Sequence, residues 1–265
     1  MQTLQREVFQ RLERLDVPFN VEGVDPFGVS RAHLAKAMTW LGWMYRNYFK
    51  VSVVGAEHVP PSGPAMLVGN HAGGYAVDAL TVYCACFFEL EPPRLAHTMA
   101  DKFLGRLPFA AEWAAKLGHL TGLPQHGLRL LRDGRLLVVF PEGVRGTAKL
   151  YSERHSLVQF GSGFMRLALE ARVPIVPFAF LGAGEAVPTF ANLRGLGQLL
   201  GLPYLPVTPY LLNIPLPVAL QIRFGVPVQP RGEADAPDAE IHEKVEDVRG
   251  RIAALMEEGL MEVVP

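Results

Sequence analysis

Short apolar runs alternate with helical patterns along most of the chain. Six runs have the length and composition of strands, and several are apolar at consecutive positions, as strands covered on both faces require: residues 50–55, 65–69, 94–99, 135–140, 173–180 and 218–225. Helical periodicity falls between them, at residues 31–49, 77–88, 108–117, 127–133 and 163–170. This alternation predicts one α/β domain with a mixed, mostly parallel sheet flanked by helices.

Amphipathic helices are expected at both ends of the chain. Over the first residues, one side of the predicted helix is apolar, through Leu4, Val8, Leu12 and Leu15. Near the other end, apolar residues recur at steps of four and three behind a candidate N-cap at Asp235 or Asp238: Ile241, Val245, Val248, Ile252 and Leu255. We therefore divide the chain into an N-terminal helical region, residues 1–50, which we expect to associate with a membrane, and an α/β domain, residues 51–265.

The composition narrows the range of partners. The formal net charge is -1, so the chain lacks the basic surplus typical of nucleic-acid binding, and we expect no nucleic-acid partner. Charged residues make up 19% of the chain and the mean hydropathy is +0.18, values that favour a lipid or membrane-surface partner. Cys84 and Cys86 lie in an apolar run, which predicts reduced core thiols, and the N-terminus lacks the apolar core of a signal peptide. We therefore expect a peripheral protein on the cytoplasmic side of a membrane.

Two segments leave a choice between core packing and lipid contact. Residues 195–222 contain no charged residue, but five prolines prevent a regular spanning helix. This segment is either a buried connection or a surface that faces a membrane or an acyl chain. Residues 31–49 combine Trp40 and Trp43 with basic residues, a composition suited to a membrane interface and equally to a core-packing helix; the basic residues are Arg31, Lys36, Arg46 and Lys50.

The stretch NHAGGYAVD follows the predicted strand 65–69 and contains candidate catalytic residues. Histidine titrates near neutral pH, so His71 is a candidate general base. A general base needs an orienting partner, and Asp78 is the nearest acid in the sequence. On one continuous helix the two residues would lie about 10.5 Å apart along the axis, too far for a hydrogen bond. A turn at Gly73 and Gly74, followed by a helix that begins near Tyr75 or Ala76, would bring Asp78 beside His71.

A second polar stretch, PEGVRG at residues 141–146, follows the predicted strand 135–140. Sites in α/β sheets gather beyond the carboxyl ends of strands, so the two stretches are expected to meet. Glu142, Gly143 and Arg145 lie in a tight turn, where side chains and backbone N–H groups can face one polar ligand. Arginine suits a phosphate or carboxylate, and glutamate suits a hydroxyl or a cation.

Taken together, these segments resemble the glycerolipid acyltransferase superfamily of the lysophosphatidic acid type. The resemblance rests on NH followed by Gly-Gly and Asp, on FPEGVRG, and on VPIVPFAF, in this order from about residue 51 to residue 230. The family's catalytic His and Asp fall on His71 and Asp78, and its acceptor-binding Glu and Arg fall on Glu142 and Arg145. The aspartate comes two residues later than in the family's NH-x4-D motif, and the His-x-Gly-Gly form resembles the branch of monoacylglycerol and diacylglycerol acyltransferases.

The resemblance implies a reaction. His71 would remove the proton from a hydroxyl of a glycerolipid acceptor, which attacks an acyl thioester directly, while Asp78 orients the imidazole. N–H groups at Gly73 or Gly74 would stabilise the oxyanion. The acyl donor, acyl-CoA or acyl carrier protein, is a co-substrate, and no cofactor is implied. We also expect no metal, since His97, His119 and His126 lack metal-ligand spacing.

The acceptor is harder to predict. Many family members carry an arginine for the acceptor phosphate where this chain has residues 118–131, in which the first arginine is Arg129, expected on the following helix. This departure favours a neutral acceptor such as monoacylglycerol or diacylglycerol. Two alternatives remain open: a lipid-binding protein of the same fold with little turnover, and transfer to a hydroxyl that does not belong to glycerol.

Overall fold

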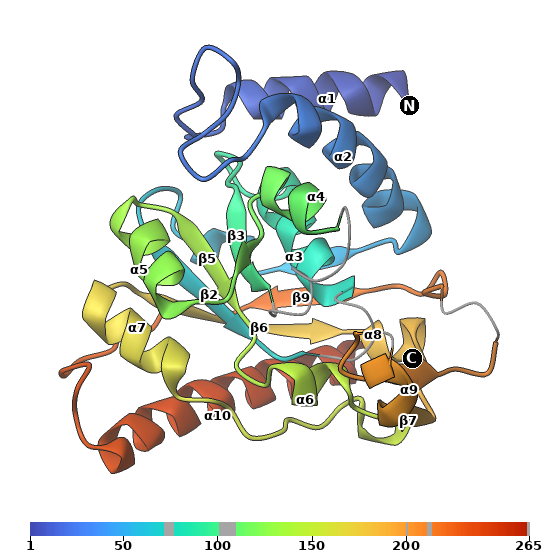
Figure 1. Ribbon diagram of the computed structural model, residues 1–265, viewed down its shortest axis with the longest axis vertical. Helices are drawn as coiled ribbons and strands as arrows, with labels where there is room; N and C mark the ends of the chain where they lie inside the picture. Colours follow the sequence, from blue (N-terminus) through green and yellow to red (C-terminus); the bar gives the residue numbers. More distant parts are fainter. Residues whose placement is uncertain (72–76, 101–109, 200, 211–213, 264–265) are drawn as a thin grey trace.

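A seven-stranded sheet runs through the centre of the protein (Figure 1). In the computed structural model, which describes residues 1–71, 77–100, 110–199, 201–210 and 214–263, the strand order is β1-β9-β6-β2-β5-β3-β4. The strands are β1 (Ser52–Val54), β2 (Ala65–Gly69), β3 (Ala96–Ala100), β4 (Leu120–Thr121), β5 (Leu136–Val139), β6 (Ile175–Leu181) and β9 (Gln221–Phe224). Neighbours pair in parallel except β6 and β9, which are antiparallel. The mixed, mostly parallel sheet is confirmed, and each of the six predicted runs contains a strand.

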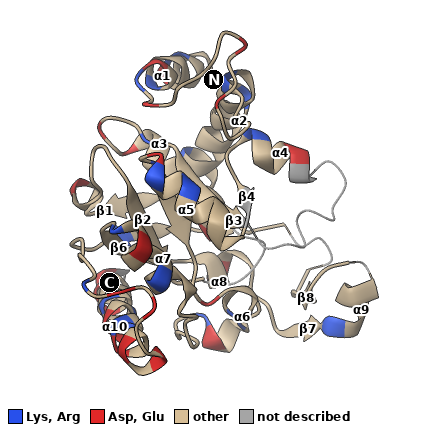
Figure 2. Cartoon of the chain, turned by 60° about the vertical axis from the view of Figure 1, so that its left-hand side comes forward, with Lys and Arg blue, Asp and Glu red and all other residues tan. Residues whose placement is uncertain are grey.

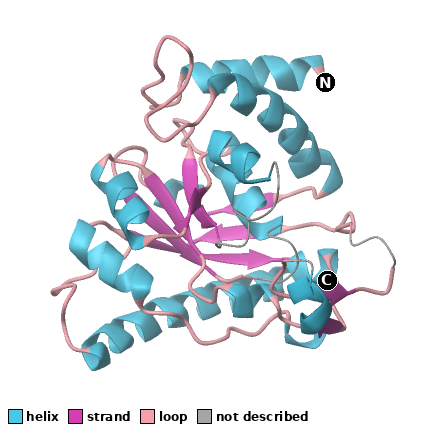
Figure 3. Cartoon of the chain, in the orientation of Figure 1, coloured by secondary structure: helices cyan, strands magenta, loops and turns pink. Residues whose placement is uncertain are grey.

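Helices cover both faces of this sheet (Figure 3). On one side of the sheet lie α3 (Val77–Phe88), then α2 (Arg31–Trp43), which packs on α3, and α1 (Gln2–Glu13), which packs on α2; α5 (Pro124–Arg132), α7 (Gly163–Ala171) and α10 (Asp238–Val263) lie on the other side. The helix α2 continues as a π-helical turn, η1 (Met44–Tyr48), so the predicted helix at 31–49 is confirmed almost to its end. Shorter helices are α4 (Ala110–Lys116), α6 (Val144–Thr147), α8 (Ala183–Ala186), and the 3-10 turns η2 (Ala56–His58) and η4 (Tyr151–Glu153).

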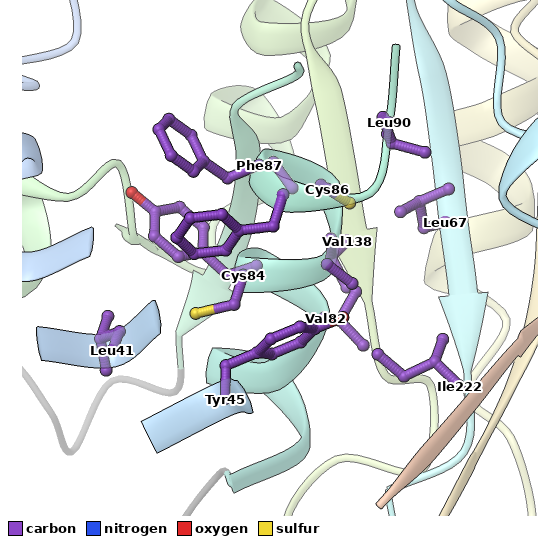
Figure 4. Close-up of a cluster of buried hydrophobic side chains, with 14 of the residues drawn as sticks. Leu41, Tyr45, Leu67, Val82, Cys84, Cys86, Phe87, Leu90, Val138 and Ile222 are labelled. Carbon is purple, nitrogen blue, oxygen red and sulfur yellow. The ribbon is translucent and has the colours of Figure 1, made fainter. Parts of the chain in front are cut away.

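The strand alternation divides the core into two clusters. In β2, Leu67 belongs to the cluster on the α3 side, whereas Met66 and Val68 belong to the cluster on the α10 side. Figure 4 shows part of the α3 side, where aromatic and aliphatic side chains surround Cys84 and Cys86. Both cysteines are buried free thiols, as predicted, and burial raises the pKa of Cys86 to about 12.

The amphipathic helices at the two ends form as the periodicity predicts. On α1, Val8 and Leu12 are buried, and on α10 the buried residues are Ile241, Val245, Val248, Ile252 and Met256. The helix α10 begins at Asp238, which pairs with Arg166 at 2.6 Å. Among the described residues, no helix is long and apolar enough to cross a membrane.

After β6, residues 191–207 form a small substructure that the sequence did not predict. The strands β7 (Ala191–Leu193) and β8 (Leu205–Val207) pair as an antiparallel two-stranded sheet, with α9 (Arg194–Leu199) between them. Large apolar side chains are exposed here and in the loop that follows: Phe190, Leu193, Leu196, Leu199, Val207, Ile214 and Leu216. Within residues 195–222, the interpretation as a buried connection is therefore wrong for Leu196, Leu199, Val207, Ile214 and Leu216.

Candidate active site

The site begins where β2 ends, because Asn70 fixes the exit of the chain from the sheet. Its side-chain Nδ2 donates to the carbonyl oxygen of Phe180 at 3.0 Å, and its Oδ1 accepts the N–H of the same residue at 2.7 Å. The buried amide thus extends the pairing of β2 with β6 by one step. His71, the next residue, is held at the carboxyl edge of the sheet.

Aromatic rings support the imidazole of His71. The ring of Phe140 stacks on it with centroids 4.3 Å apart and 14° between the planes, and Phe178 meets Phe140 edge-on at 5.7 Å. Gly69 makes room for this arrangement, because a Cβ at that position would lie 2.3 Å from the Phe178 ring. The side chain of His71 is consequently only 12% exposed.

Asp78 contacts His71 directly. The helix α3 begins at Val77 in the described chain, so Asp78 lies in its first turn, where the helix dipole favours a carboxylate. Its Oδ2 lies 2.6 Å from Nδ1 of His71, and the carboxylate is fully buried. A carboxylate in this place holds the imidazole tautomer with the proton on Nδ1 and stabilises the imidazolium.

Glu142 reaches His71 from the neighbouring strand. Since β2 and β5 are adjacent and parallel, the segments that follow them meet, as the sequence predicts. One oxygen of Glu142 accepts the N–H of His71 at 3.0 Å, and the other accepts the N–H of Val158 at 3.0 Å. Glu142 is 2% exposed. The residue expected to bind the acceptor therefore supports the backbone of the candidate base in this structure.

The glycines of the FPEGVRG segment are required by its geometry. Gly143 has φ 55° and ψ -147°, a conformation essentially restricted to glycine. A Cβ on Gly146 would lie 2.5 Å from Cβ of His71 and 2.7 Å from Cβ of Glu142, so this glycine permits the close approach of α6 to the site. Between them Arg145 is exposed, and its Nη2 donates to the carbonyl oxygen of Gln159 at 3.2 Å.

Lys149 is a residue of the site that sequence reasoning missed. Its Nζ lies 2.6 Å from Oε2 of Glu142 and donates to the carbonyl oxygen of His71 at 2.7 Å. The side chain is 1% exposed, and burial lowers the pKa of this lysine. A lysine inside TAKLY belongs to no motif and follows no spacing rule, so the sequence alone does not distinguish it from surface lysines.

Other predicted residues lie elsewhere or outside the described chain. Gly73 and Gly74 fall in residues 72–76, which the structure does not describe. Arg129 lies on α5, as predicted, with its guanidinium 5.0 Å from the ring centroid of Phe27. His97 and His119 are buried, and within the described residues no group of three or more His, Cys, Asp and Glu side chains could hold a metal ion.

Known proteins resemble this chain in sequence. Residues 50–181 match the family model described as Acyltransferase. An uncharacterized protein of Mycobacterium tuberculosis is 36% identical over 214 residues, which are 77% of this chain and 60% of that protein. A Gallus gallus protein named DGAT1/2-independent enzyme synthesizing storage lipids is 29% identical over 183 residues, 68% of this chain and 53% of that protein. The chain thus spans less than two thirds of the length of these relatives.

A solved structure shares the fold. It is the 1-acyl-sn-glycerophosphate (LPA) acyltransferase PlsC from Thermotoga maritima, with a TM-score of 0.54 and 18% identity, covering 88% of this chain and 82% of that one. Residues 50–181 include both motifs of the site and the strands β2 and β5 that they follow. The chain belongs to the Acyltransferase family, which it matches through residues 50–181.

Proposed function

We propose that the protein transfers a fatty acyl group from an acyl thioester, acyl-CoA or acyl carrier protein, to a hydroxyl of a glycerolipid. The contact between His71 and Asp78 carries this proposal, because it places an oriented imidazole at the sheet edge of an acyltransferase-family domain. The lipid-binding alternative depended on His71 lacking a partner. A distance of 2.6 Å to a buried carboxylate removes that reason.

The proposed mechanism uses His71 as the general base. With Nδ1 turned to Asp78, Nε2 is the ring nitrogen that would take the proton from the acceptor hydroxyl as its oxygen attacks the thioester carbonyl. The tetrahedral intermediate then expels the thiolate, which recovers a proton from the imidazolium. General-base catalysis of this kind typically supplies about 10²- to 10⁴-fold in rate. The remainder would come from alignment of the two bound substrates.

A neutral acceptor remains our expectation. Arg145, an exposed cation in the FPEGVRG motif, already donates to a protein carbonyl, whereas Arg129 packs on Phe27. The Gallus gallus relative is named as an enzyme synthesizing storage lipids, which supports monoacylglycerol or diacylglycerol as the acceptor. The PlsC neighbour, named for an LPA substrate, is less similar in sequence.

A membrane surface is the proposed source of the lipid acceptor. On α2, Leu34 and Met38 are buried in the core, while Trp40 and Trp43 are 58% and 40% exposed. One side of the helix therefore packs on the protein, and the exposed tryptophans are available for contact with lipid. Arg46 is bonded to Glu7 at 2.6 Å through both of its terminal nitrogens, and it therefore joins α1 to η1. The other basic residues of this region, Arg31, Lys36 and Lys50, are exposed.

The described residues between 190 and 216 offer a second apolar surface. Figure 2 shows this region around β7, β8 and α9 almost without charged residues. It is joined to the site, since Asn192 Nδ2 donates to the carbonyl oxygen of Ala148 at 2.7 Å. It is also joined to the N-terminal helices, since the hydroxyl of Tyr48 donates to the carbonyl oxygen of Pro215 at 2.7 Å. Both apolar surfaces are thus tied to elements of one domain.

A competition assay tests the proposed function. Purified protein receives one acyl-CoA together with monoacylglycerol, diacylglycerol and lysophosphatidic acid, and both free thiol and lipid products are measured. We expect acceptor-dependent thiol release, with neutral acceptors used at least as well as the phosphorylated one. Thiol release that no acceptor stimulates, with either acyl donor, would contradict acyl transfer. A strong preference for lysophosphatidic acid that collapses in Arg145→Lys would instead show that Arg145 alone binds a phosphate.

A further inference from the structure

A single ion pair holds both backbone groups of His71. Lys149 donates to the carbonyl oxygen of His71 at 2.7 Å, and Glu142 accepts the N–H of His71 at 3.0 Å. The N–H and the C=O of a residue belong to the two peptide planes that flank its Cα, so holding both restricts φ and ψ together. The ion pair therefore determines the direction in which the imidazole leaves the backbone.

The interior position of this pair argues against a role in stability alone. The side chains of Lys149 and Glu142 are 1% and 0% exposed, and their charged atoms lie 2.6 Å apart. Removing two charges from water costs about as much as their attraction returns, so a buried pair is weak evidence of net stabilisation. Burial lowers the pKa of Lys149, while the carboxylates of Glu142 and Asp78 act in the opposite direction and favour its charged form.

The ion pair of Lys149 and Glu142 also determines the net charge around His71. Among the described residues, the ionisable groups that contact His71 are Asp78 from α3, Glu142 from the turn after β5 and Lys149 from the segment after α6. Arg145, on α6 itself, is exposed and bonded to Gln159. The two carboxylates and one ammonium sum to a single negative charge, which a proton taken up by His71 would neutralise. Without the ammonium the sum is two negative charges.

We propose that Lys149 is a positioning residue for the general base, which it serves by holding the backbone of His71 and by balancing the charge of Asp78 and Glu142. This inference rests on the proposed function of His71 as the base. Lys149 lies outside the motifs that carry the family resemblance. The inference also assigns a role to Glu142, which holds the backbone N–H of His71 and pairs with Lys149.

Charge-altering variants separate positioning from simple packing. In Lys149→Met the extra negative charge should move the acidic limb of the pH profile of kcat/KM upward by about one pH unit, and Glu142→Gln should move it downward by a similar amount. In the double variant Glu142→Gln/Lys149→Met the net charge matches the wild type, so the midpoint should return. Its kcat should still be about tenfold lower with KM little changed, because methionine cannot donate to the carbonyl of His71.

The double variant keeps the test informative if a single variant fails to fold. Breaking a buried pair leaves an uncompensated charge, so either single variant can fail to fold, whereas a neutral pair of similar volume is usually tolerated. If only the double variant folds, a wild-type kcat in that variant overturns the proposal. If the single variants fold, a profile midpoint that does not move in Lys149→Met overturns it.

A measurement without substrate distinguishes this inference from the proposed function. The imidazole proton resonances of His71 are titrated by NMR in the wild type and in the folded variants, with His71→Gln to assign them. We expect the titration midpoint to rise in Lys149→Met, to fall in Glu142→Gln and to return in the double variant. Absence of acyl transfer by the wild type would refute the proposed function, and an NMR midpoint in a folded single variant that coincides with that of the wild type would independently refute the charge balance.

Discussion

Nδ1 of His71 lies 2.6 Å from Oδ2 of Asp78, although residues 72–77 separate the two in the chain. The family motif places its aspartate two residues earlier, and the later position does not prevent the contact. Because Asp78 lies in the first turn of α3 rather than deep in a continuous helix, its carboxylate faces back toward the end of β2. The contact, rather than the spacing of the motif, is what a general base requires.

Replacement of His71 should abolish acyl transfer. We expect His71→Ala to lower the rate by about 10²- to 10⁴-fold, the usual contribution of a general base. The ring is stacked on Phe140 and mostly buried, so the melting temperature should fall as well, and rates must be compared per folded protein. A folded variant that keeps more than about a tenth of the wild-type rate would contradict the role of His71.

The orienting carboxylate can be tested without changing its shape. Asp78→Asn preserves the volume of a fully buried side chain and removes the charge that supports the imidazolium. We expect kcat to fall by at least about tenfold while circular dichroism spectra stay unchanged. Steady-state kinetics at saturating acceptor measures this effect. Wild-type kcat in this variant would contradict the orienting role of Asp78.

Position 146 should tolerate no side chain, because Gly146 packs closely against His71. A Cβ there would lie 2.5 Å from Cβ of His71, so Gly146→Ala should displace the histidine or α6 and lower kcat by about tenfold or more. Gly250→Ala provides the matched control, since a Cβ there meets nothing within 4 Å in the helix α10. This control should retain activity and gain roughly 0.5–1 kcal/mol in the free energy of unfolding. Equal activity of the two variants would show that the contact does not constrain the site.

Membrane contact through the two apolar surfaces is open to vesicle flotation. We expect Trp40→Ser/Trp43→Ser and Leu196→Ser/Leu199→Ser each to weaken vesicle binding by at least about tenfold, since burying even one large apolar side chain contributes about 1.5–3 kcal/mol. Val226→Ser is the matched control, because Val226 is 63% exposed but follows β9, beside the start of β6 and away from residues 190–216. A folded variant that floats as well as the control would exclude its surface as a main anchor.

Two buried histidines should make the fold sensitive to acid. Burial lowers the pKa of His97 and of His119 to about 4, from an ordinary 6.5. Between these values the unfolded chain binds more protons than the folded one, so the free energy of unfolding is fully retained above pH 6.5 and falls as the pH drops toward 4. The full effect is of the order of 3 kcal/mol for each histidine.

Urea unfolding at several pH values measures this dependence. The variant His97→Asn/His119→Asn keeps a polar atom near each Nδ1, which bonds to Gly118 and Thr98 respectively, and cannot titrate. We expect its stability to change less than that of the wild type between pH 6.5 and pH 4. The same slope in both proteins would show that other groups cause the acid sensitivity.

Much of the fold follows from local sequence patterns. Apolar runs over consecutive residues specify the covered strands, because both faces of a central strand are buried, and the steps of three and four on residues 241–255 specify the last helix. The residues of the candidate site could also be found from the sequence where they follow strands. His71 and Glu142 lie beyond β2 and β5, and the carboxyl ends of parallel neighbours share one edge of a sheet.

Other features depend on contacts that no local pattern encodes. The contacts of Glu142 could not be predicted from its motif, because the side that its carboxylate faces depends on where His71 and Lys149 arrive from elsewhere in the chain. Lys149 itself gave no signal, since a buried lysine differs from a surface lysine only by its partners. The apolar residues 195–222 were equally ambiguous, because composition measures hydrophobicity but not exposure. Only tertiary packing decides which apolar side chains find a core and which remain, like Leu199, at the surface.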